Sequence, residues 1–315
     1  MAALMLLSGP DCATAYLPPD AIVVRDGQVR TWGIEGHRGF QGAGLDGAGH
    51  LWVANHGRLF EDGDQVMVTG AEVEALAFGG EQVRALTWDG RETELVDPVA
   101  GERVSVPITQ PLVQAALAVN DDGVVALAAT AHDDRGRTVP VSAVRVDGAW
   151  TALDLDVTIR GGVPLSAAGA DRVVLAWNYQ GRAGPGVQLF TLYLDGRGLV
   201  REDKLDGSAS GVTIGGDGQT WFVDEGDGVR VSQVGGCRVP LDAGESGAAL
   251  TPSDTAVDVV TLQDGQVQQI PVDLDCQPGE PVVLGSGPSY WLPSCYWNSG
   301  PSVLASCQQQ LQGCK

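Results

Sequence analysis

The sequence contains very little positive charge. Of its 315 residues, 19 are lysine or arginine and 40 are aspartate or glutamate, so the formal net charge at pH 7 is −21. The only lysines are Lys204 and Lys315. Such an acidic surface repels phosphate backbones and anionic lipid headgroups, which argues against nucleic acids as partners. The preferred interpretation is that the acidic residues keep the protein soluble. The alternative is that they form a face that attracts cations or a basic partner.

Long apolar runs and helical patterns are also missing. No apolar stretch reaches the roughly 18 residues of a membrane-spanning helix, so we expect no transmembrane segment in the mature chain. No segment shows the i, i+3, i+4, i+7 spacing of an amphipathic helix. Hydrophobic residues make up 43% of the chain and come in short alternating runs, separated by many of the 44 glycines. This pattern predicts an all-β chain with many turns.

Recognisable catalytic and cofactor motifs are absent from the sequence. There is no Walker loop, no H-E-x-x-H zinc motif and no EF-hand loop. Residues 207–211 approach a nucleophile elbow but have alanine where the serine would stand. We therefore lean toward a binding protein rather than an enzyme, with no cofactor expected; calcium or another divalent metal is the alternative.

Residues 42–70 contain the pattern around which the chain is organised. Four short apolar runs in this stretch are separated by turn sequences, and we expect strands at residues 42–45, 51–54, 58–60 and 65–68. Asp62-Gly63 is a strong hairpin signal, because the favoured hairpin turns need residues that tolerate positive φ. Similar units return at intervals of roughly thirty to fifty residues, which is the range of β-propeller blades.

The two ends of the repeat region indicate a closed ring. A hairpin at residues 22–32 resembles the second half of the unit, and residues 282–292 resemble a first half. The N-terminal hairpin would complete the last blade and leave no open sheet edge. We therefore predict an all-β β-propeller over residues 16–294. Seven blades are preferred, with six as the alternative because the copy at residues 248–284 is weak.

One repeat carries a family resemblance. Residues 46–53, Asp46-Gly47-Ala48-Gly49-His50-Leu51-Trp52-Val53, resemble the D-x-x-G-x-L-W repeat of the extracellular propellers attached to bacterial two-component sensors. Residues 215–222 are similar but lack the leading aspartate, and residues 216–221 also resemble a degenerate sialidase-type Asp box. The resemblance implies a propeller fold and a ligand-sensing module. It assigns no functional residue.

The first residues predict export. Residues 1–9 are short and apolar like the core of a secretory signal, although its basic segment is missing, and Ala13-Thr14-Ala15 would serve as a cleavage site. We therefore interpret residues 1–15 as a signal-peptide remnant. A secreted, periplasmic or cell-surface location follows from this interpretation.

The cysteines support the same location. They cluster toward the C-terminus without a C-x2-C pair, which indicates disulfides formed in an oxidising compartment. Residues 295–315 are expected to form a cysteine-containing tail that caps the ring closure. The pairing is left open by the sequence. The candidates are Cys12, Cys237, Cys276, Cys295, Cys307 and Cys314.

Loop residues on one face of the expected ring are the candidate ligand site. Insertions at residues 130–139 and 178–186 fall at the same place in two repeats, between the second and third strands. Three histidines would converge on that face; the alternative is that they are separate, solvated loop residues. The candidates for ligand binding are His37, Arg38, His56, His132, Asp133, Trp177, Asn178, Tyr179 and Arg182.

Two functions remain open at this point. The preferred one is a secreted or periplasmic propeller that binds an unknown protein or small molecule, or serves as a scaffold, through loops on one face. The alternative is a propeller lyase or hydrolase that uses scattered histidines and acidic residues, with or without a divalent metal. Asp224, Glu225 and Asp227 form an acidic loop on the same face and are weak candidates for calcium, a solvated turn being the alternative.

Overall fold

The structure is a computed structural model of the whole chain. Side chains are described only between residues 43 and 285, and not for residues 180–181, 200–202, 225–228, 248–249 and 262. The residues that the structure describes are 5–8, 12–16, 20–25, 28–33, 42–55, 57–155, 163–181, 184–195, 200–226, 228–241, 248–253, 256–263, 266–286, 303–305 and 313–314.

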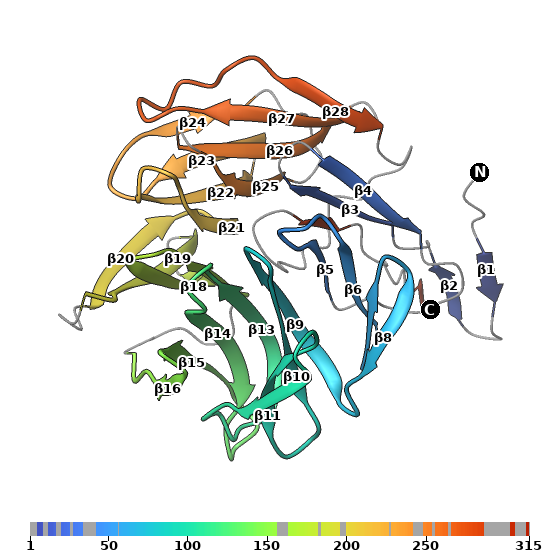
Figure 1. Cartoon of the computed structure of the whole chain (residues 1–315). Helices are drawn as coiled ribbons and strands as arrows, with labels where there is room; N and C mark the ends of the chain where they lie inside the picture. The colour runs from blue at the N-terminus through green and yellow to red at the C-terminus, as the bar shows by residue number, and fades with distance from the viewer. Residues whose placement is uncertain are drawn as a thin grey trace.

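Six four-stranded antiparallel sheets are arranged as the blades of a ring (Figure 1). In each blade, consecutive strands pair as a meander. The first three blades consist of β5 (Gly42–Leu45), β6 (Leu51–Asn55), β7 (Arg58–Glu61) and β8 (Asp64–Val68); β9 (Glu72–Gly79), β10 (Gln82–Trp88), β11 (Thr93–Asp97) and β12 (Glu102–Ser105); and β13 (Leu112–Val119), β14 (Val125–His132), β15 (Thr138–Val146) and β16 (Ala149–Ala152).

The other three blades follow the same order around the ring. They consist of β17 (Pro164–Ala168), β18 (Arg172–Gly181), β19 (Gly184–Tyr193) and β20 (Val200–Asp206); β21 (Ala209–Ile214), β22 (Thr220–Gly226), β23 (Gly228–Gln233) and β24 (Arg238–Pro240); and β25 (Ala248–Pro252), β26 (Val257–Gln263), β27 (Gln266–Val272) and β28 (Val282–Ser286). Within the described residues, no helix is long and apolar enough to span a membrane.

The repeat unit that the sequence predicts at residues 42–70 is the first blade. Its hairpin turn has positive φ at both central residues, 48° at Asp62 and 98° at Gly63. The same pair of positive φ angles occurs at Asp147 and Gly148. This is the turn that matches the twist of two antiparallel strands, which explains why Asp-Gly located the hairpins correctly.

The prediction of seven blades is wrong, and the six-blade alternative is correct. Residues 282–286 do not begin a further blade, because β28 pairs with β27 as the fourth strand of the sixth blade. A connection over residues 273–281 separates these two strands and contains a turn in which the Cys276 N–H bonds to the Asp273 carbonyl. In the sequence, that turn looks like the boundary between two blades. The pairing of β27 with β28 across it depends on residues far apart in the chain, so the sequence pattern did not reveal it.

The chain ends form two further sheets of three strands. The predicted N-terminal hairpin exists as β3 (Asp20–Arg25) and β4 (Gln28–Gly33), and β3 also pairs with β29 (Val303–Ala305) from the tail. This sheet contacts β5 on one side and β25 and β28 on the other (Figure 1). The hairpin therefore stands between the first and sixth blades and does not complete the blade that contains residues 282–286.

The second small sheet joins the extreme ends of the chain. It consists of β1 (Met5–Ser8), β2 (Cys12–Tyr16) and β30 (Gly313–Cys314). Cys12 and Cys314 are opposite one another in its backbone register. The domain boundaries expected at residues 15 and 294 stay predictions.

The core lies between neighbouring blades. Trp221 of the fifth blade packs with Val259 and Ile270 of the sixth, and Trp177 of the fourth blade packs with Ala128 of the third. Burying one such large apolar side chain stabilises the fold by about 1.5–3 kcal/mol. Since each cluster joins two blades, the ring is held together by packing between sheets.

A disulfide reinforces one of these contacts. Cys237, in the turn between β23 and β24, is bonded to Cys276 in the connection between β27 and β28, with a Cα–Cα distance of 6.2 Å. The bond therefore ties the fifth blade to the sixth. It confirms two of the predicted disulfide cysteines, while Cys295 and Cys307 lie outside the described residues.

Candidate functional site

The two insertions expected between second and third strands are hairpins rather than long loops. β14 continues to His132 and β15 starts at Thr138, so only a turn over residues 133–137 remains. The Asp133 carboxylate accepts hydrogen bonds from the backbone N–H groups of Arg135 and Arg137 and from the Arg137 guanidinium. Likewise, β18 ends at residue 181 and β19 begins at residue 184. Most residues of each predicted loop are therefore paired in strands.

The aromatic and amide candidates of the fourth blade take part in packing, two of them between blades and Tyr179 within its own blade. Trp177 is 1% exposed, and its indole N–H donates to the Ala129 carbonyl of the third blade at 3.0 Å. The Asn178 side chain donates to the Ala209 carbonyl and accepts from the Ala209 N–H, at 2.7 and 2.8 Å. Tyr179 lies close against Gly186 on the neighbouring strand. These contacts explain the three side chains as parts of the framework.

The proposed convergence of histidines stays a prediction. His132 is exposed at the end of β14. The remaining candidates of that group lie outside the described residues; they are His37, Arg38, His56 and Arg182.

The acidic loop contains a buried ion-pair centre. Asp224 is 1% exposed and pairs with Arg230, at 3.4 Å, and with Arg238. Two guanidinium groups therefore balance its charge without a metal ion. The Glu225 side chain and Asp227 lie outside the described residues, so a calcium site in this loop stays a prediction.

The opposite face of the ring is built from the turns between first and second strands. In three of these turns, the N–H of a glycine bonds to the carbonyl three residues earlier: Gly49 to Asp46, Gly123 to Asn120, and Gly218 to Gly215. Each of these glycines has φ between 72° and 88°, a region that side chains rarely adopt. Glycine therefore recurs at this position because the turn geometry requires it.

A cavity of about 700 Å³ opens among these turns. The innermost strands of all six blades, β5, β9, β13, β17, β21 and β25, contribute to its wall, so it lies at the centre of the ring. This volume is in the range of small-molecule binding sites. Among the described lining residues, none is lysine, arginine or histidine, and four are aspartates: Asp121, Asp122, Asp171 and Asp258.

The four aspartates differ in their electrostatic surroundings. Asp171 is paired with Arg172 through two hydrogen bonds of 2.9 and 2.7 Å, and the hydrogen bond from this guanidinium lowers the pKa of Asp171. Asp258 is half-buried, and burial raises the pKa of its carboxyl although Gln269 donates a hydrogen bond to it at 2.7 Å. Within the described part of the chain, no basic side chain pairs with Asp258. Among the described side chains, Gln269 is therefore the group that compensates its charge.

One residue of the cavity wall has a buried hydroxyl group. Ser166 lines the cavity, and its Oγ is buried without a hydrogen-bond partner among the described residues. A buried polar atom without a partner costs free energy.

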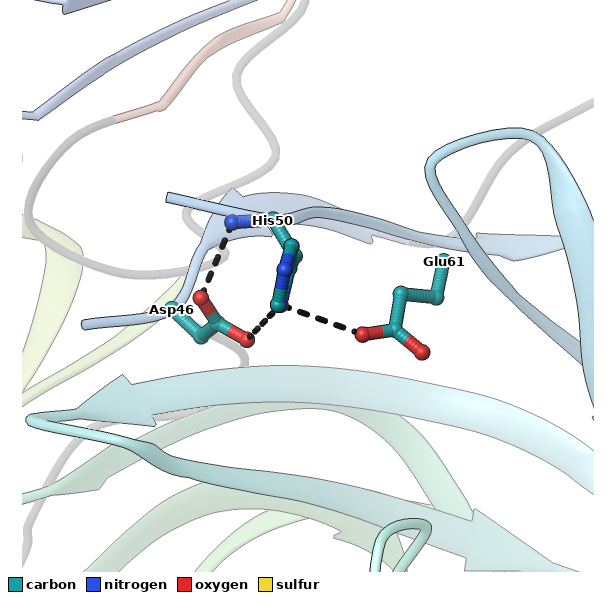
Figure 2. Close-up of side chains that lie close together, drawn as sticks. All are labelled: Asp46, His50 and Glu61. Atoms are coloured by element: carbon teal, nitrogen blue, oxygen red, sulfur yellow. Dashed lines mark hydrogen bonds and ion pairs between the residues drawn. The ribbon is translucent and has the colours of Figure 1, made fainter. Parts of the chain in front are cut away.

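A second cluster of polar side chains lies beside the first of these turns. Figure 2 shows the His50 ring between the carboxylates of Asp46 and Glu61. His50 Nδ1 is 3.3 Å from Asp46 Oδ2 and 3.2 Å from Glu61 Oε1. Burial, the largest effect, raises the pKa of Asp46, but hydrogen bonds from Trp52 and from backbone N–H groups, together with the nearby His50, outweigh it and lower the pKa.

Both places escaped the sequence-based candidates, for different reasons. Asp258 is an acidic residue inside the otherwise apolar run at residues 256–262, and that interruption was a usable signal. Glu61 is brought to Asp46 and His50 only because it pairs across the sheet with Trp52. That register joins residues that no linear motif contains.

Comparisons with known proteins support the fold. No protein-family model and no curated protein matches the chain. The β-propeller domain of the Trilobed protease from Pyrococcus furiosus is 12% identical, with a TM-score of 0.51, and the match covers 93% of this chain and 98% of that one.

Two further solved structures are similar at lower TM-scores. TolB from Acinetobacter baumannii is 15% identical at a TM-score of 0.45, covering 86% of this chain and 64% of that one. AztD from Citrobacter koseri is 12% identical at 0.44, covering 87% and 96%. Together with the observed topology, the Trilobed protease match identifies the chain as a β-propeller protein. The resemblance to two-component sensor repeats stays a prediction.

Proposed function

We propose that this protein is a ligand-binding β-propeller that holds a small organic cation in its central cavity. The observation that carries the proposal is the Asp258 carboxylate, which lines the cavity and lacks a basic partner among the described residues. Removing a carboxylate from water is costly unless an opposite charge accompanies it. A bound cation supplies that charge.

The mouth of the cavity is negatively charged, like Asp258 in its wall. Asp121 and Asp122 are exposed in the turn between β13 and β14 and belong to the cavity lining. Clefts lined by one sign of charge raise the local concentration of oppositely charged ligands and speed their association. The net charge of −21 adds to this attraction.

The matching ligand group is an amine or a guanidinium. Either group can donate hydrogen bonds to the Asp258 carboxylate in the cavity wall. A free polyamine and the lysine or arginine side chain of a peptide share this chemistry. The experiment below separates these two sources.

We further propose that the protein acts outside the reducing cytosol, in the periplasm or beyond. The Cys237–Cys276 bond supports this, because disulfides persist in oxidising compartments. The alternative of a lyase or hydrolase rests on the convergence of His37, His56 and His132, and it stays a prediction.

Calorimetric titration of the full chain tests the cation site. The probes are spermidine, an acetylated Gly-Lys-Gly amide and an acetylated Gly-Arg-Gly amide. We expect at least one to bind, and Asp258→Asn to weaken that binding at least tenfold. Asp147→Asn removes the same charge from an exposed hairpin turn whose positive φ asparagine tolerates, so we expect no change in that control.

The pattern of probes identifies the source of the ligand. Binding of spermidine alone indicates a free polyamine, whereas binding of the peptides alone indicates a peptide side chain. Higher salt should weaken the interaction, because exposed charges such as Asp121 and Asp122 are screened. Absence of binding by all three probes, or equal binding by wild type and Asp258→Asn, contradicts the proposal.

A further inference from the structure

The cluster of Asp46, His50 and Glu61 has the geometry of a metal site. Two atoms bound at about 2.0–2.1 Å to one tetrahedral zinc ion lie about 3.3 Å apart. In the cluster, His50 Nδ1 is 3.3 Å from Asp46 Oδ2 and 3.2 Å from Glu61 Oε1, and one potential ligand atom from each residue lies within 4.8 Å of the others. The two distances from His50 therefore match neighbouring corners of one coordination shell, and the two carboxylates lie near enough to share it.

Asp46 is held rigidly in this arrangement. Its Oδ1 accepts the N–H groups of Ala48 and His50, each at 2.9 Å, and its Oδ2 accepts the Trp52 indole N–H at 3.0 Å. Metal ligands in proteins are commonly oriented by such outer hydrogen bonds. Oδ1 accepts two bonds, but Oδ2 accepts only the indole N–H, so its second lone pair leaves Asp46 able to bind a cation.

Glu61 is also fixed by the backbone around it. It lies opposite Trp52 in the pairing of β6 and β7. The next residue, Asp62, donates its N–H to the Leu51 carbonyl at 2.8 Å and accepts the Leu51 N–H on its side chain at 2.9 Å. The side chains of Glu61 and His50 are 33% and 49% exposed, so a bound ion could exchange with solvent and complete its shell with water.

The fifth blade shows what this turn needs for stability alone. There, Asp217 accepts the Trp221 indole N–H at 3.2 Å, a contact like that between Asp46 and Trp52, although Asp217 is four residues before its tryptophan and Asp46 is six before Trp52. Gln233 is opposite Trp221, where the first blade has Glu61 opposite Trp52, and its amide donates to Asp217 at 3.1 Å.

Comparing the two blades shows which side chains the turn needs for stability and which it does not. A neutral glutamine satisfies the aspartate in the fifth blade, so the turn does not require a second carboxylate. Gln219 also stands two residues before Trp221, where the first blade has His50 two residues before Trp52. The first blade therefore has a second carboxylate and an imidazole in place of two neutral amides, and both are metal ligands.

We propose that Asp46, His50 and Glu61 bind a divalent transition-metal ion, with zinc as the best match. One imidazole and two carboxylates suit zinc, whereas calcium and magnesium prefer sites made of oxygen alone. The site goes beyond the proposed cation binding and is independent of it, because it uses none of the carboxylates in the cavity. It lies on the same face, since Leu45 lines the cavity directly before Asp46.

Zinc affinity is measured on the metal-free full chain, without a histidine tag, in competition with a chromophoric chelator. We expect one high-affinity zinc ion per chain. His50→Gln and Glu61→Gln introduce the residues of the fifth blade, so both variants should keep the melting temperature of the metal-free wild type. We expect each to weaken zinc binding at least tenfold.

Glu102→Gln is the matched control for Glu61→Gln, because it removes an exposed carboxylate on β12. Its zinc affinity should equal that of the wild type. Two results would overturn the proposal. One is no zinc binding by the wild type at millimolar concentration, which leaves an ion-paired cluster. The other is equal affinity of wild type, His50→Gln and Glu61→Gln, which places the zinc elsewhere on the acidic surface.

Discussion

At the level of single residues, aspartate has two different roles in this chain. In the turns, carboxylates such as those of Asp46 and Asp217 are satisfied by backbone N–H groups and by an indole N–H. In the cavity, Asp258 has Gln269 as its hydrogen-bond donor and no basic partner among the described residues. We expect the first kind to stabilise the fold and the second to cost stability, and the second is the carboxylate that we propose binds a ligand.

The cost of Asp258 gives a prediction for the ligand-free protein. Burial raises its pKa in the folded state, so the unfolded chain releases this proton at a lower pH than the folded chain does. The free energy of unfolding therefore falls as the pH rises through the interval between the two pKa values, and the loss is complete above the folded value. Asp258→Asn removes this loss, so the variant should be more stable than wild type at neutral pH.

Denaturant unfolding of both proteins at several pH values checks this expectation. The difference in free energy of unfolding between Asp258→Asn and wild type should grow from acidic to neutral pH, because the amide of the variant does not ionise. A variant that is less stable than wild type at neutral pH would show that the carboxylate is compensated in the folded protein. Gain of stability together with loss of cation binding is the combination expected of a functional carboxylate.

At the level of strands and turns, local chemistry was readable and long-range pairing was not. Asp62-Gly63 and Asp147-Gly148 located their hairpins because the turn is specified by the residues within it. β28 was assigned to the wrong blade because nine residues with a turn of their own, 273–281, separate it from β27. The strands near residues 132 and 181 were predicted too short, since pairing with a neighbour extends them beyond the apolar run.

The disulfide between two such turns carries the next prediction. Cys276 has φ of 57°, the conformation that glycine fills in the comparable turn at Gly136. Replacing Cys237 by alanine and Cys276 by glycine therefore removes the bond without adding backbone strain. For a sequence separation of 39 residues, we expect a loss of about 3–4 kcal/mol in the free energy of unfolding.

Two comparisons make the disulfide experiment specific. Cys237→Ala with Cys276→Ala should be about 1 kcal/mol less stable than the glycine version, because alanine is strained at positive φ. Reductant should lower the melting temperature of the wild type more than that of either double variant. An unchanged melting temperature of the wild type under reductant would mean that the packing of Trp221 against the sixth blade holds the two blades without the bond.

At the level of the whole molecule, the ring decides which residues meet. The sequence predicted a propeller and its turns, yet the candidate ligand residues were placed on the face that carries the turn at residues 133–137. The cavity, and beside it the cluster of Asp46, His50 and Glu61, lie on the face of the turns between first and second strands. Residues from six blades line the cavity, so no single repeat of the sequence contains a motif for it.

Hydrogen–deuterium exchange of the full chain tests most directly which face binds, when it is measured with and without a saturating amount of the probe that binds in the calorimetric titration. We expect slower exchange around Asp258 and in the turns at residues 46–50, 119–123, 169–171 and 214–218, with little change elsewhere. Slower exchange confined to residues 133–137 and 178–186 would place binding on the opposite face. That result, or no change anywhere in the chain, would contradict the account of a cation held in the central cavity.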